Sequence, residues 1–305
     1  MTTINHTHTP VLYDQSIDRM TCRQRPSGKN SGTQKWRDLL FMHWEIPIPL
    51  AQSLLPAGLE LDLYDGKAWI AVVPFAMYDV KPSFLPSWMA FNFLECNVRL
   101  YVIAASQPGV YFLSLEAASW LAVQAARIGW KLPYFYAHMQ AQINPPQVDP
   151  IAVPSPSSVA SAMNPLHSSS LSSSSNPSTP SNSSVNAPLA EENATTTIDY
   201  HSRRKDGVGL DLSYQRSNTI IYASVGSVEF FFLERYLLFV QRGQHIYSGQ
   251  VYHTPYPIMP AELSKLDQNL TASHGCPLTQ FPAYVHASPG VDVEVFALEK
   301  MFSLP

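Results

Sequence analysis

The clearest alternation of polar and apolar positions in the chain lies between Phe93 and Tyr101. Side chains of a β-strand point alternately to its two faces, so an acid, an amide and a guanidinium would share one face here, with an aromatic residue at each end. That face comprises Phe93, Glu95, Asn97, Arg99 and Tyr101. The opposite face is mainly apolar. The pattern predicts a strand whose polar face is a pocket floor if it points into a barrel, and an ordinary amphipathic surface if it points to water.

The preceding segment, residues 67–78, is apolar on both faces. Such a strand is typical of a sheet that is covered on both sides, which favours a layered architecture. Pro74 within it indicates an edge or a bulge. Similar runs bounded by turn residues predict further strands at 39–46, 59–64, 110–115, 132–143, 197–204, 210–216, 236–241, 245–252, 283–287 and 291–298.

Three segments have the spacing or the caps of short helices. Pro49 suits the first turn of a helix that ends near residue 55. Residues 118–129 carry small apolar side chains at helical spacing, which would let this helix lie close to a sheet. Ser227 is a suitable cap for a helix at 228–235. Together the segments predict a mainly β, α+β fold: a mostly antiparallel barrel or sandwich with short helices packed on it.

Two segments lack these patterns. Residues 1–35 are polar, and we expect a flexible N-terminal tail before a single domain that spans residues 36–300. Residues 144–196 are rich in Ser, Pro and Asn and contain no aromatic residue. Burial cannot offset the entropy of ordering such a segment, so we expect a disordered insert. A loop within the domain is favoured over a domain linker because each flank resembles half of a hairpin.

Composition narrows the possible classes of protein. The 305 residues are 46% hydrophobic and only 14% charged, which allows a substantial core. A net charge of −4 without a basic run argues against a nucleic-acid partner. The sequence has neither a signal-peptide pattern at its start nor an apolar run of membrane-spanning length, so we expect a cytoplasmic chain with no membrane partner. Three scattered cysteines agree with free thiols in a reducing compartment.

Several short motifs occur in the order in which a known family carries them. These motifs are Trp36–Phe41, Leu54–Leu61, Asp65–Trp69, Val73–Phe75, Asn97–Arg99, Gly109–Phe112, Leu132–Phe135, Ser202–Arg204 and Glu234–Tyr236. The chain thereby resembles the DUF2071, or YqjF-like, family, which is grouped with the acetoacetate decarboxylase-like fold. The resemblance covers roughly residues 36–143 and 197–300. It implies a closed, antiparallel, double-layered β-barrel or cone with a central cavity, and it implies no known reaction.

The resemblance to acetoacetate decarboxylase itself is weaker. That enzyme forms a Schiff base through a lysine pair that follows a proline, on the strand after a helix that carries an arginine. The similar stretch here runs from Arg127 to Phe135, and Tyr134 and Phe135 stand where the lysines would be. Neither side chain has an amine, and Lys131 precedes the proline, so decarboxylation through a Schiff base is not expected. The enzyme's pocket also holds an acid on a strand, and Glu95 is similar in placement.

The polar strand face and its expected surroundings supply the candidate site. The candidate ligand-binding residues are His43, Glu95, Asn97, Arg99, Tyr101, Arg127 and Tyr134. Arg99 offers a planar fork for a carboxylate. Glu95, desolvated in a barrel, would have a raised pKa and is the candidate catalytic acid or base. The competing interpretation is a structural Glu–Arg pair, and for His43 it is a hydrogen-bonded core residue. No metal-ligand spacing or cofactor motif is present, so neither a metal nor a cofactor is expected.

Two functions fit this pattern, and a purely structural role is a third possibility. The first is a barrel that binds a small, partly apolar, carboxylate-bearing molecule, with Arg99 as the anchor. Its apolar wall would be formed by Trp44, Trp69, Tyr101 and Tyr134. The alternative is an acid–base enzyme without Schiff base or metal, such as a lyase, isomerase or hydratase that acts on a keto-acid-like substrate through Glu95. Binding is favoured because the sequence contains no visible nucleophile–base pair.

Overall fold

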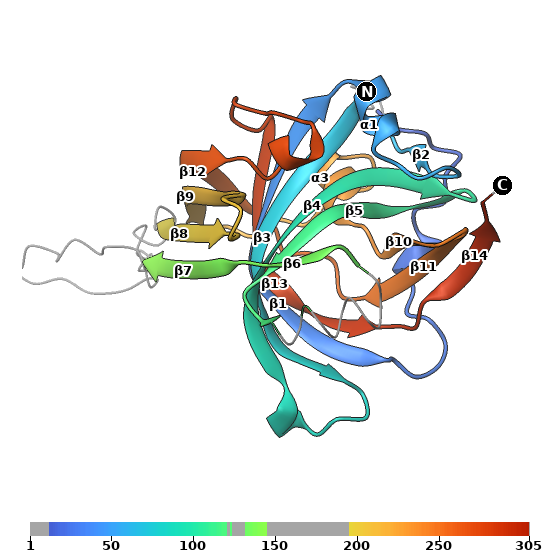
Figure 1. The fold of residues 1–305 in the computed structure, drawn as a ribbon, viewed down its shortest axis with the longest axis horizontal. Helices are drawn as coiled ribbons and strands as arrows, with labels where there is room; N and C mark the ends of the chain where they lie inside the picture. Colours follow the sequence, from blue (N-terminus) through green and yellow to red (C-terminus); the bar gives the residue numbers. More distant parts are fainter. Residues whose placement is uncertain (1–11, 121–122, 124–131, 145–194, 305) are drawn as a thin grey trace, which may run out of the picture.

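The computed structural model describes residues 12–120, 123, 132–144 and 195–304, and strands dominate them (Figure 1). The strands are β1 (Gly32–Ile46), β2 (Glu60–Leu61), β3 (Ala68–Pro82), β4 (Phe91–Ala104), β5 (Gln107–Ala117), β6 (Tyr134–Tyr136), β7 (His138–Asn144), β8 (Thr195–Arg203), β9 (Gly209–Ser217), β10 (Leu237–Arg242), β11 (His245–Tyr252), β12 (Met259–Gln268), β13 (Tyr284–Val295) and β14 (Glu299–Ser303). The described helices are α1 (Ile48–Ser53) and α3 (Val228–Leu233), with 3₁₀ turns η1 (Thr21–Arg23), η2 (Ser87–Met89) and η4 (Ala272–His274). The expected mainly β fold with a few short helices is confirmed.

Most strands belong to one large sheet, in the order β14-β11-β10-β5-β4-β3-β1-β13-β12-β9-β8-β7. β11 also pairs with β13, so the path of pairings from β13 through β1, β3, β4, β5, β10 and β11 returns to β13. The sheet is mostly antiparallel, as expected, but it is mixed because β5 pairs in parallel with both β10 and β6. Parallel neighbours need a long connection, and residues 118–133 provide it between β5 and β6.

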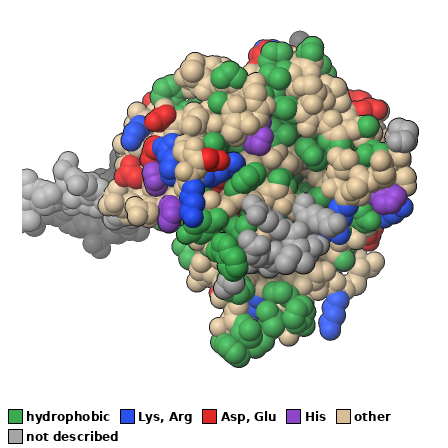
Figure 2. Space-filling model, viewed as in Figure 1, with side chains coloured by type: hydrophobic (Ala, Val, Ile, Leu, Met, Phe, Trp, Pro, Cys, Tyr) green, Lys and Arg blue, Asp and Glu red, His purple; other side chains and the backbone are tan. Residues whose placement is uncertain are grey.

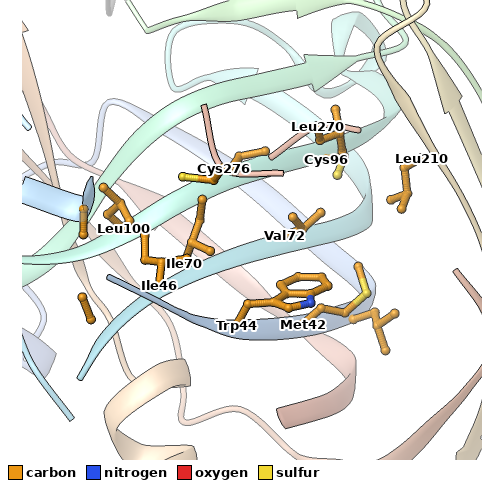
Figure 3. Close-up of a cluster of buried hydrophobic side chains, with 14 of the residues drawn as sticks. Met42, Trp44, Ile46, Ile70, Val72, Cys96, Leu100, Leu210, Leu270 and Cys276 are labelled. Carbon is orange, nitrogen blue, oxygen red and sulfur yellow. The ribbon is translucent and has the colours of Figure 1, made fainter. Parts of the chain in front are cut away.

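The central strands bury both of their faces. On one face, residues such as Val72 pack with Leu210 of β9 in a first hydrophobic cluster (Figure 3). On the other face, residues such as Val73 pack with Phe232 of α3 in a second cluster. The strands β7, β8, β9 and β12 lie to one side of the curved remainder and cover the first face (Figure 1). The layered architecture expected from the doubly apolar segment at 67–78 is thus present.

Helix α3 places three phenylalanines in the core. The hydroxyl of Ser227 accepts a hydrogen bond from the Phe230 amide at 3.2 Å, which confirms the predicted cap. Phe230, Phe231 and Phe232 are all buried. The cap therefore fixes where the helix begins, and Phe231 and Phe232 pack in the second cluster.

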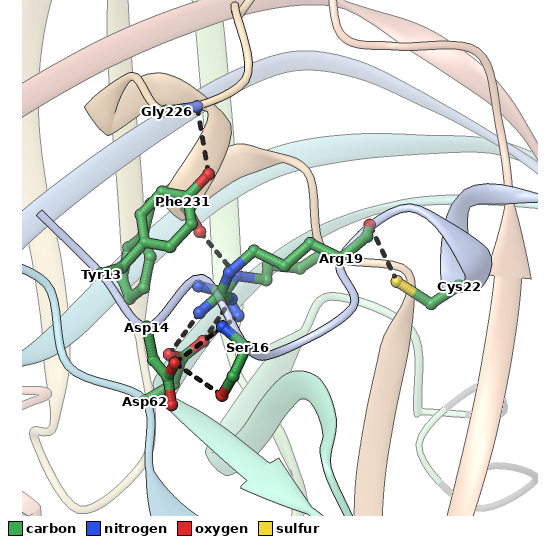
Figure 4. Close-up of polar contacts among 9 residues, drawn as sticks. Tyr13, Asp14, Ser16, Arg19, Cys22, Asp62, Gly226 and Phe231 are labelled. Atoms are coloured by element: carbon green, nitrogen blue, oxygen red, sulfur yellow. Dashed lines mark hydrogen bonds and ion pairs between the residues drawn. The ribbon is translucent and has the colours of Figure 1, made fainter. Parts of the chain in front are cut away.

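The N-terminal segment is packed from residue 12 onward, so the expectation of a flexible tail through residue 35 is wrong for this part. Arg19 is only 6% exposed and donates hydrogen bonds of 2.6 and 2.8 Å to Asp62 (Figure 4). A buried ion pair can order a segment that has little apolar surface, and hydrophobic periodicity does not reveal such a pair. Residues 1–11 lie outside the described residues.

Strand β13 joins the two strands that were expected at 283–287 and 291–298. Gly290 lies where they meet, with φ of +120°, and a Cβ at this position would stand 1.9 Å from the carbonyl oxygen of Trp36. Glycine therefore lets the backbones of β1 and β13 approach closely at this point. The Ser-Pro-Gly sequence suggested a turn, but pairing with β1 keeps the strand continuous.

Strand β12 was missed because its sequence is polar and proline-flanked. It pairs with β9 over seven residue pairs and leaves alternate side chains exposed. Its hydrogen-bonding partner, not an apolar pattern, makes this segment a strand. The strand expected at 59–64 is shorter than predicted, because only the two residues of β2 pair with β4.

The long insert connects two neighbouring strands. β7 and β8 form an antiparallel pair in which Asn144 lies opposite Thr197, which confirms that the flanks are the halves of a hairpin. The insert that we expect to be disordered lies, from 145 to 194, outside the described residues. The expected helix at 118–129 also falls mostly outside them, although Trp120 and Val123 are helical.

Exposed apolar side chains lie at the tip of the β3–β4 hairpin. Phe84 and Trp88 are 84% and 83% exposed, and apolar side chains gather at the lower edge of the view in Figure 2. None of the helices that the structure describes combines the length and the apolar character needed to cross a membrane.

Candidate functional site

The polar residues of β4 form a buried row. Glu95, Asn97 and Arg99 are 3%, 5% and 9% exposed, and Tyr101 is buried at the end of the row. These residues alternate with Cys96, Val98 and Leu100 of the first cluster, so their side chains lie on the face that carries the second cluster. The row therefore points into the molecule and not to water.

Glu95 is held by a tyrosine from a neighbouring strand. The hydroxyl of Tyr134 donates a hydrogen bond of 2.8 Å to Oε2 of Glu95, because β6 pairs with β5 and brings Tyr134 beside Leu115. Burial raises the pKa of Glu95 to about 8; the hydrogen bond from Tyr134 opposes this shift, and the charge of Glu116 adds to it. The carboxyl is therefore mostly protonated near pH 7, with one oxygen accepting from Tyr134 and a proton available for donation.

Arg99 is a buried guanidinium with weak contacts. Its Nη2 lies 3.4 Å from both the Tyr101 hydroxyl and the Phe232 carbonyl oxygen. The guanidinium carbon lies 5.5 and 5.6 Å from the ring centroids of Phe41 and Tyr101. No carboxylate among the described residues forms an ion pair with it, and Nε has no hydrogen-bond partner there. Buried arginines are usually paired, so this one retains capacity for an anion.

Asn97 lies between these two residues. Its Oδ1 is buried and has no hydrogen-bond partner within the described part of the chain. Glu95 and Arg99 are four residues apart on one strand, about 13 Å along its axis, and each has other contacts. The contacts of the described residues therefore do not include a structural Glu95–Arg99 pair, which was the competing interpretation of this face.

His43 closes the inner end of the row. Its Nε2 lies 2.7 Å from the Tyr101 hydroxyl, and its ring stacks on Phe232 at 3.9 Å between centroids. Burial, followed by the charges of His286 and Arg99, holds the pKa of His43 well below its usual range. His43 is fully buried and neutral, which matches the hydrogen-bonded core residue weighed against a general base.

The remaining candidates are placed unequally. Trp69 packs in the second cluster, but Trp44 packs in the first and so lies on the opposite face of the sheet. The expectation that Trp44 lines the pocket is therefore wrong. Side chains alternate along β1, and Trp44 lies on the face that carries the first cluster. Arg127 and Lys131 lie outside the described residues.

A buried charge cluster next to the row was not anticipated. Asp62 accepts from Nη1 of Arg235 at 2.6 Å as well as from Arg19, and the Arg235 guanidinium lies 5.0 Å from the centroid of the Tyr101 ring. Burial raises the pKa of Asp62, but the two guanidiniums outweigh it and leave this pKa below its ordinary value. The sequence did not predict this contact, because Asp62 and the two arginines are far apart in sequence and belong to no common pattern.

A second unanticipated pair lies on the other face. Arg204 forms an ion pair with Glu116, and its guanidinium stacks on Phe135 at 3.8 Å from the ring centroid. The neighbouring Arg203 pairs instead with Asp211, nearer the surface. The sequence feature that could have indicated a buried ion pair at Glu116 is its position as the one acid in the strand β5. Within the described ranges, no group of three or more His, Cys, Asp or Glu side chains is placed to hold a metal ion.

The geometry supports two kinds of chemistry. The protonated carboxyl of Glu95 can donate a hydrogen bond to an acceptor on a ligand. The guanidinium of Arg99, which forms no ion pair with the described residues, can bind an anion. Tyr134 and Phe135 lack the amine needed for an imine, so those two positions cannot form a Schiff base.

Comparisons with known proteins agree with this fold. The solved structure of the enduracididine biosynthesis enzyme MppR complexed with pyruvate superposes with a TM-score of 0.54 at 10% sequence identity, over 92% of this chain and 94% of that one. An acetoacetate decarboxylase from Legionella pneumophila gives a TM-score of 0.51 at 10% identity, over 92% of each chain. At such identities the likeness concerns the fold alone.

Sequence comparison is more specific. The chain is 28% identical over 270 residues to the uncharacterized protein YqjF of Bacillus subtilis (strain 168), which covers 88% of this chain and 91% of YqjF. The DUF2071 family, described as an uncharacterized conserved protein, matches residues 33–184 and 180–292. The order of motifs, the acetoacetate decarboxylase-like fold and this match lead to one conclusion: the chain belongs to the DUF2071 family.

Proposed function

We propose that the protein binds a small, partly apolar organic acid, with the carboxylate of the ligand at Arg99. The observation that carries this proposal is a pair of atoms on one strand face, Nε of Arg99 and Oδ1 of Asn97, that have no hydrogen-bond partner among the residues that the structure describes. Both side chains are more than nine-tenths buried. An unpaired buried cation destabilises the protein, and a ligand carboxylate would satisfy it with charge-assisted hydrogen bonds.

The surroundings of the row suit the rest of such a ligand. Leu115, Leu132 and Val240 form a small buried cluster against which Tyr134 packs. Leu115 lies opposite Asn97 on the neighbouring strand, so this apolar cluster borders the row. Because Glu95 lies about 13 Å along the strand from Arg99, its protonated carboxyl would donate only to an oxygen at the far end of a longer ligand. A small acid held by Arg99 would lie nearer to Asn97 and this apolar cluster.

The fold neighbours support the ligand class. MppR, which shares the fold, has been solved in complex with pyruvate, a small keto-acid. The acetoacetate decarboxylase neighbour is named for a keto-acid as well. Keto-acids are therefore the first ligands to test on this chain.

An acid–base enzyme is the second candidate, and the pKa of Glu95 favours it. A carboxyl with a pKa of about 8 exchanges protons near neutral pH, which suits general acid–base catalysis. The substrate would be held by Arg99 in the same way. The two candidates differ only in whether Glu95 transfers a proton to or from the ligand.

Calorimetric titration with pyruvate and 2-oxobutyrate tests the proposal, with butanone as the matched ketone that lacks a carboxylate. We expect saturable binding of the keto-acids, no binding of butanone, and at least a tenfold loss in Arg99→Met, since charge-assisted hydrogen bonds contribute about 1.5–3 kcal/mol. Arg203→Met, which removes a surface arginine, is the control and should bind normally. Keto-acid binding that is unchanged in Arg99→Met would refute the proposal.

Proton NMR of the same mixtures separates the two candidates. Turnover by the wild-type protein that disappears in Glu95→Gln, while binding persists, favours the enzyme. Binding without turnover in either protein favours the binding module.

A further inference from the structure

A cavity of about 130 Å³ lies between the main sheet and the strands that project from it. Its walls are formed by Pro74, Ala76 and Leu94 from the main sheet and by Ile143, Ile198 and Tyr214 from the projecting strands. Most of these side chains are apolar. Ala141 and Ile143 of β7 are exposed, so the cavity opens to solvent on the β7 side.

This cavity is separate from the polar row. Leu94 lines it, and the next residue, Glu95, points to the opposite face of β4. The hydroxyl of Tyr200 donates to the backbone carbonyl of Glu95 at 2.8 Å, so the backbone of β4 separates the two places. Phe75, opposite Glu95 on β3, also lines the cavity, but neither Glu95 nor Arg99 is among the described residues that line it.

One buried polar atom in the cavity wall lacks a partner. Tyr214 is 1% exposed, and its hydroxyl has no hydrogen-bond partner among the residues that the structure describes. Buried tyrosine hydroxyls usually have one. Tyr200, the other tyrosine of the wall, uses its hydroxyl for the Glu95 carbonyl. The Tyr214 hydroxyl is therefore the group available to a ligand.

A second polar group belongs to the same wall. Asp38 lines the cavity, and its Oδ1 accepts a hydrogen bond of 3.0 Å from Nη2 of Arg216. Asp38 stands at a break in the β1–β3 register and has φ of +51°, an uncommon conformation for a residue other than glycine. The cavity thus combines an apolar body with one donor hydroxyl and one paired carboxylate.

We propose that this cavity binds a small, uncharged aromatic or alicyclic alcohol, with its ring against the apolar walls and its hydroxyl at Tyr214. A cavity of this size holds a molecule of roughly the size of benzene. A hydroxyl fits better than a carbonyl because it can accept from Tyr214 while donating toward Asp38. The Arg216–Asp38 pair leaves no net charge to attract an ion.

Phenol and toluene are suitable probes because they differ mainly in the hydroxyl. Each is titrated into the full chain and followed by ligand-observed NMR, with melting temperatures as a check of folding. We expect saturable binding of phenol and weaker binding of toluene. Tyr214→Phe keeps the ring and removes the hydroxyl, so it should weaken phenol binding by roughly three- to tenfold, the value of one hydrogen bond, and leave toluene within about twofold.

Ala141→Phe fills the cavity from its exposed edge and should weaken both probes at least tenfold, and Ile143→Trp provides a second filling variant if the first fails to fold. Three outcomes would overturn the proposal: no saturable phenol binding to the wild-type protein, equal affinity for phenol and toluene, or phenol affinity unchanged in Tyr214→Phe. Binding that survives in both filling variants would place the probes elsewhere and would also overturn it.

Discussion

Glu95 and Arg99 lie on one face of one strand, and burial keeps the acid neutral while the guanidinium is a cation. Glu95 is buried beside the Tyr134 hydroxyl and holds its proton near pH 7. Arg99 remains a cation among a hydroxyl, a carbonyl oxygen and two aromatic rings. The row therefore presents a neutral donor at one end and a positive charge at the other, which is the polarity that an oxo-acid would match.

Glu95→Gln should remove part of the pH dependence of stability. The folded-state pKa of Glu95 is raised from 4.5 to about 8, so the folded protein keeps a proton that the unfolded chain releases as pH rises above about 4.5. Wild-type stability should therefore decrease between pH 5 and 8, by roughly 3–5 kcal/mol at most from this group. Urea unfolding at both pH values measures it, with the exposed Glu45→Gln as control. Equal pH dependence in wild type and Glu95→Gln would contradict the assignment.

Tyr134→Phe should shift the pKa of Glu95 further upward. The Tyr134 hydroxyl donates to the carboxylate and so favours its charged form, and the variant loses this contribution while the ring stays in place. The shift can be measured by following the side-chain carboxyl of Glu95 by ¹³C NMR as a function of pH. An unchanged or lower pKa would show that this hydrogen bond has little influence.

At the scale of elements, the N-terminal segment and the connection between α3 and β10 meet at Asp62. Arg19 comes from the segment before η1, and Arg235 follows α3. Arg19 also lies over the ring of Tyr13 at 4.4 Å, and the Tyr13 hydroxyl accepts from the Gly226 amide (Figure 4). One carboxylate thereby ties a polar segment to the helix that fills the core.

Asp62→Asn should be strongly destabilising, by about 3–5 kcal/mol, because two buried guanidiniums lose their counter-charge. Arg19→Met should cost less, since Asp62 keeps Arg235, but it should release the N-terminal segment. Urea unfolding gives the stabilities, and hydrogen exchange of residues 12–31 reports the release. If Arg19→Met left that exchange unchanged, the pair would not be what orders the segment.

Periodic elements were predictable from the sequence, and elements held by distant partners were not. A run that is apolar on both faces identified β3, alternation identified the polar row of β4, and turn and cap residues identified β10, β11 and α3. β12 was hidden because backbone pairing with β9 maintains it. At the site, the strand pattern placed Glu95 and Arg99 on one face, and the doubly apolar segment at 67–78 and the family resemblance favoured the inward orientation that the structure has. Their separate partners were not predictable, because each contact comes from another element.

At the scale of the whole molecule, the insert is a connection between paired strands. Replacing residues 145–194 with a short Gly-Ser turn should change the free energy of unfolding by less than about 1 kcal/mol, since closure entropy varies only slowly with loop length. Urea unfolding and the keto-acid titration provide the measurements. Replacement of Asp206–Gly207, the turn between β8 and β9, is the matched comparison, in which we expect a larger loss in the free energy of unfolding. A large loss of stability or binding on removing the insert would mean that it contributes to the fold or the site.

The pairing of β1 with β13 sets the order in which the chain can fold during synthesis. Gly32 lies opposite Val295, so one edge of β1 has no partner until almost the entire chain has left the ribosome. A nascent chain that ends before β13 would carry an apolar strand with an open edge, a state that favours association with other chains. Late closure therefore makes β13 decisive for the yield of folded protein, and truncations that remove Tyr284–Val295 should accumulate as aggregates.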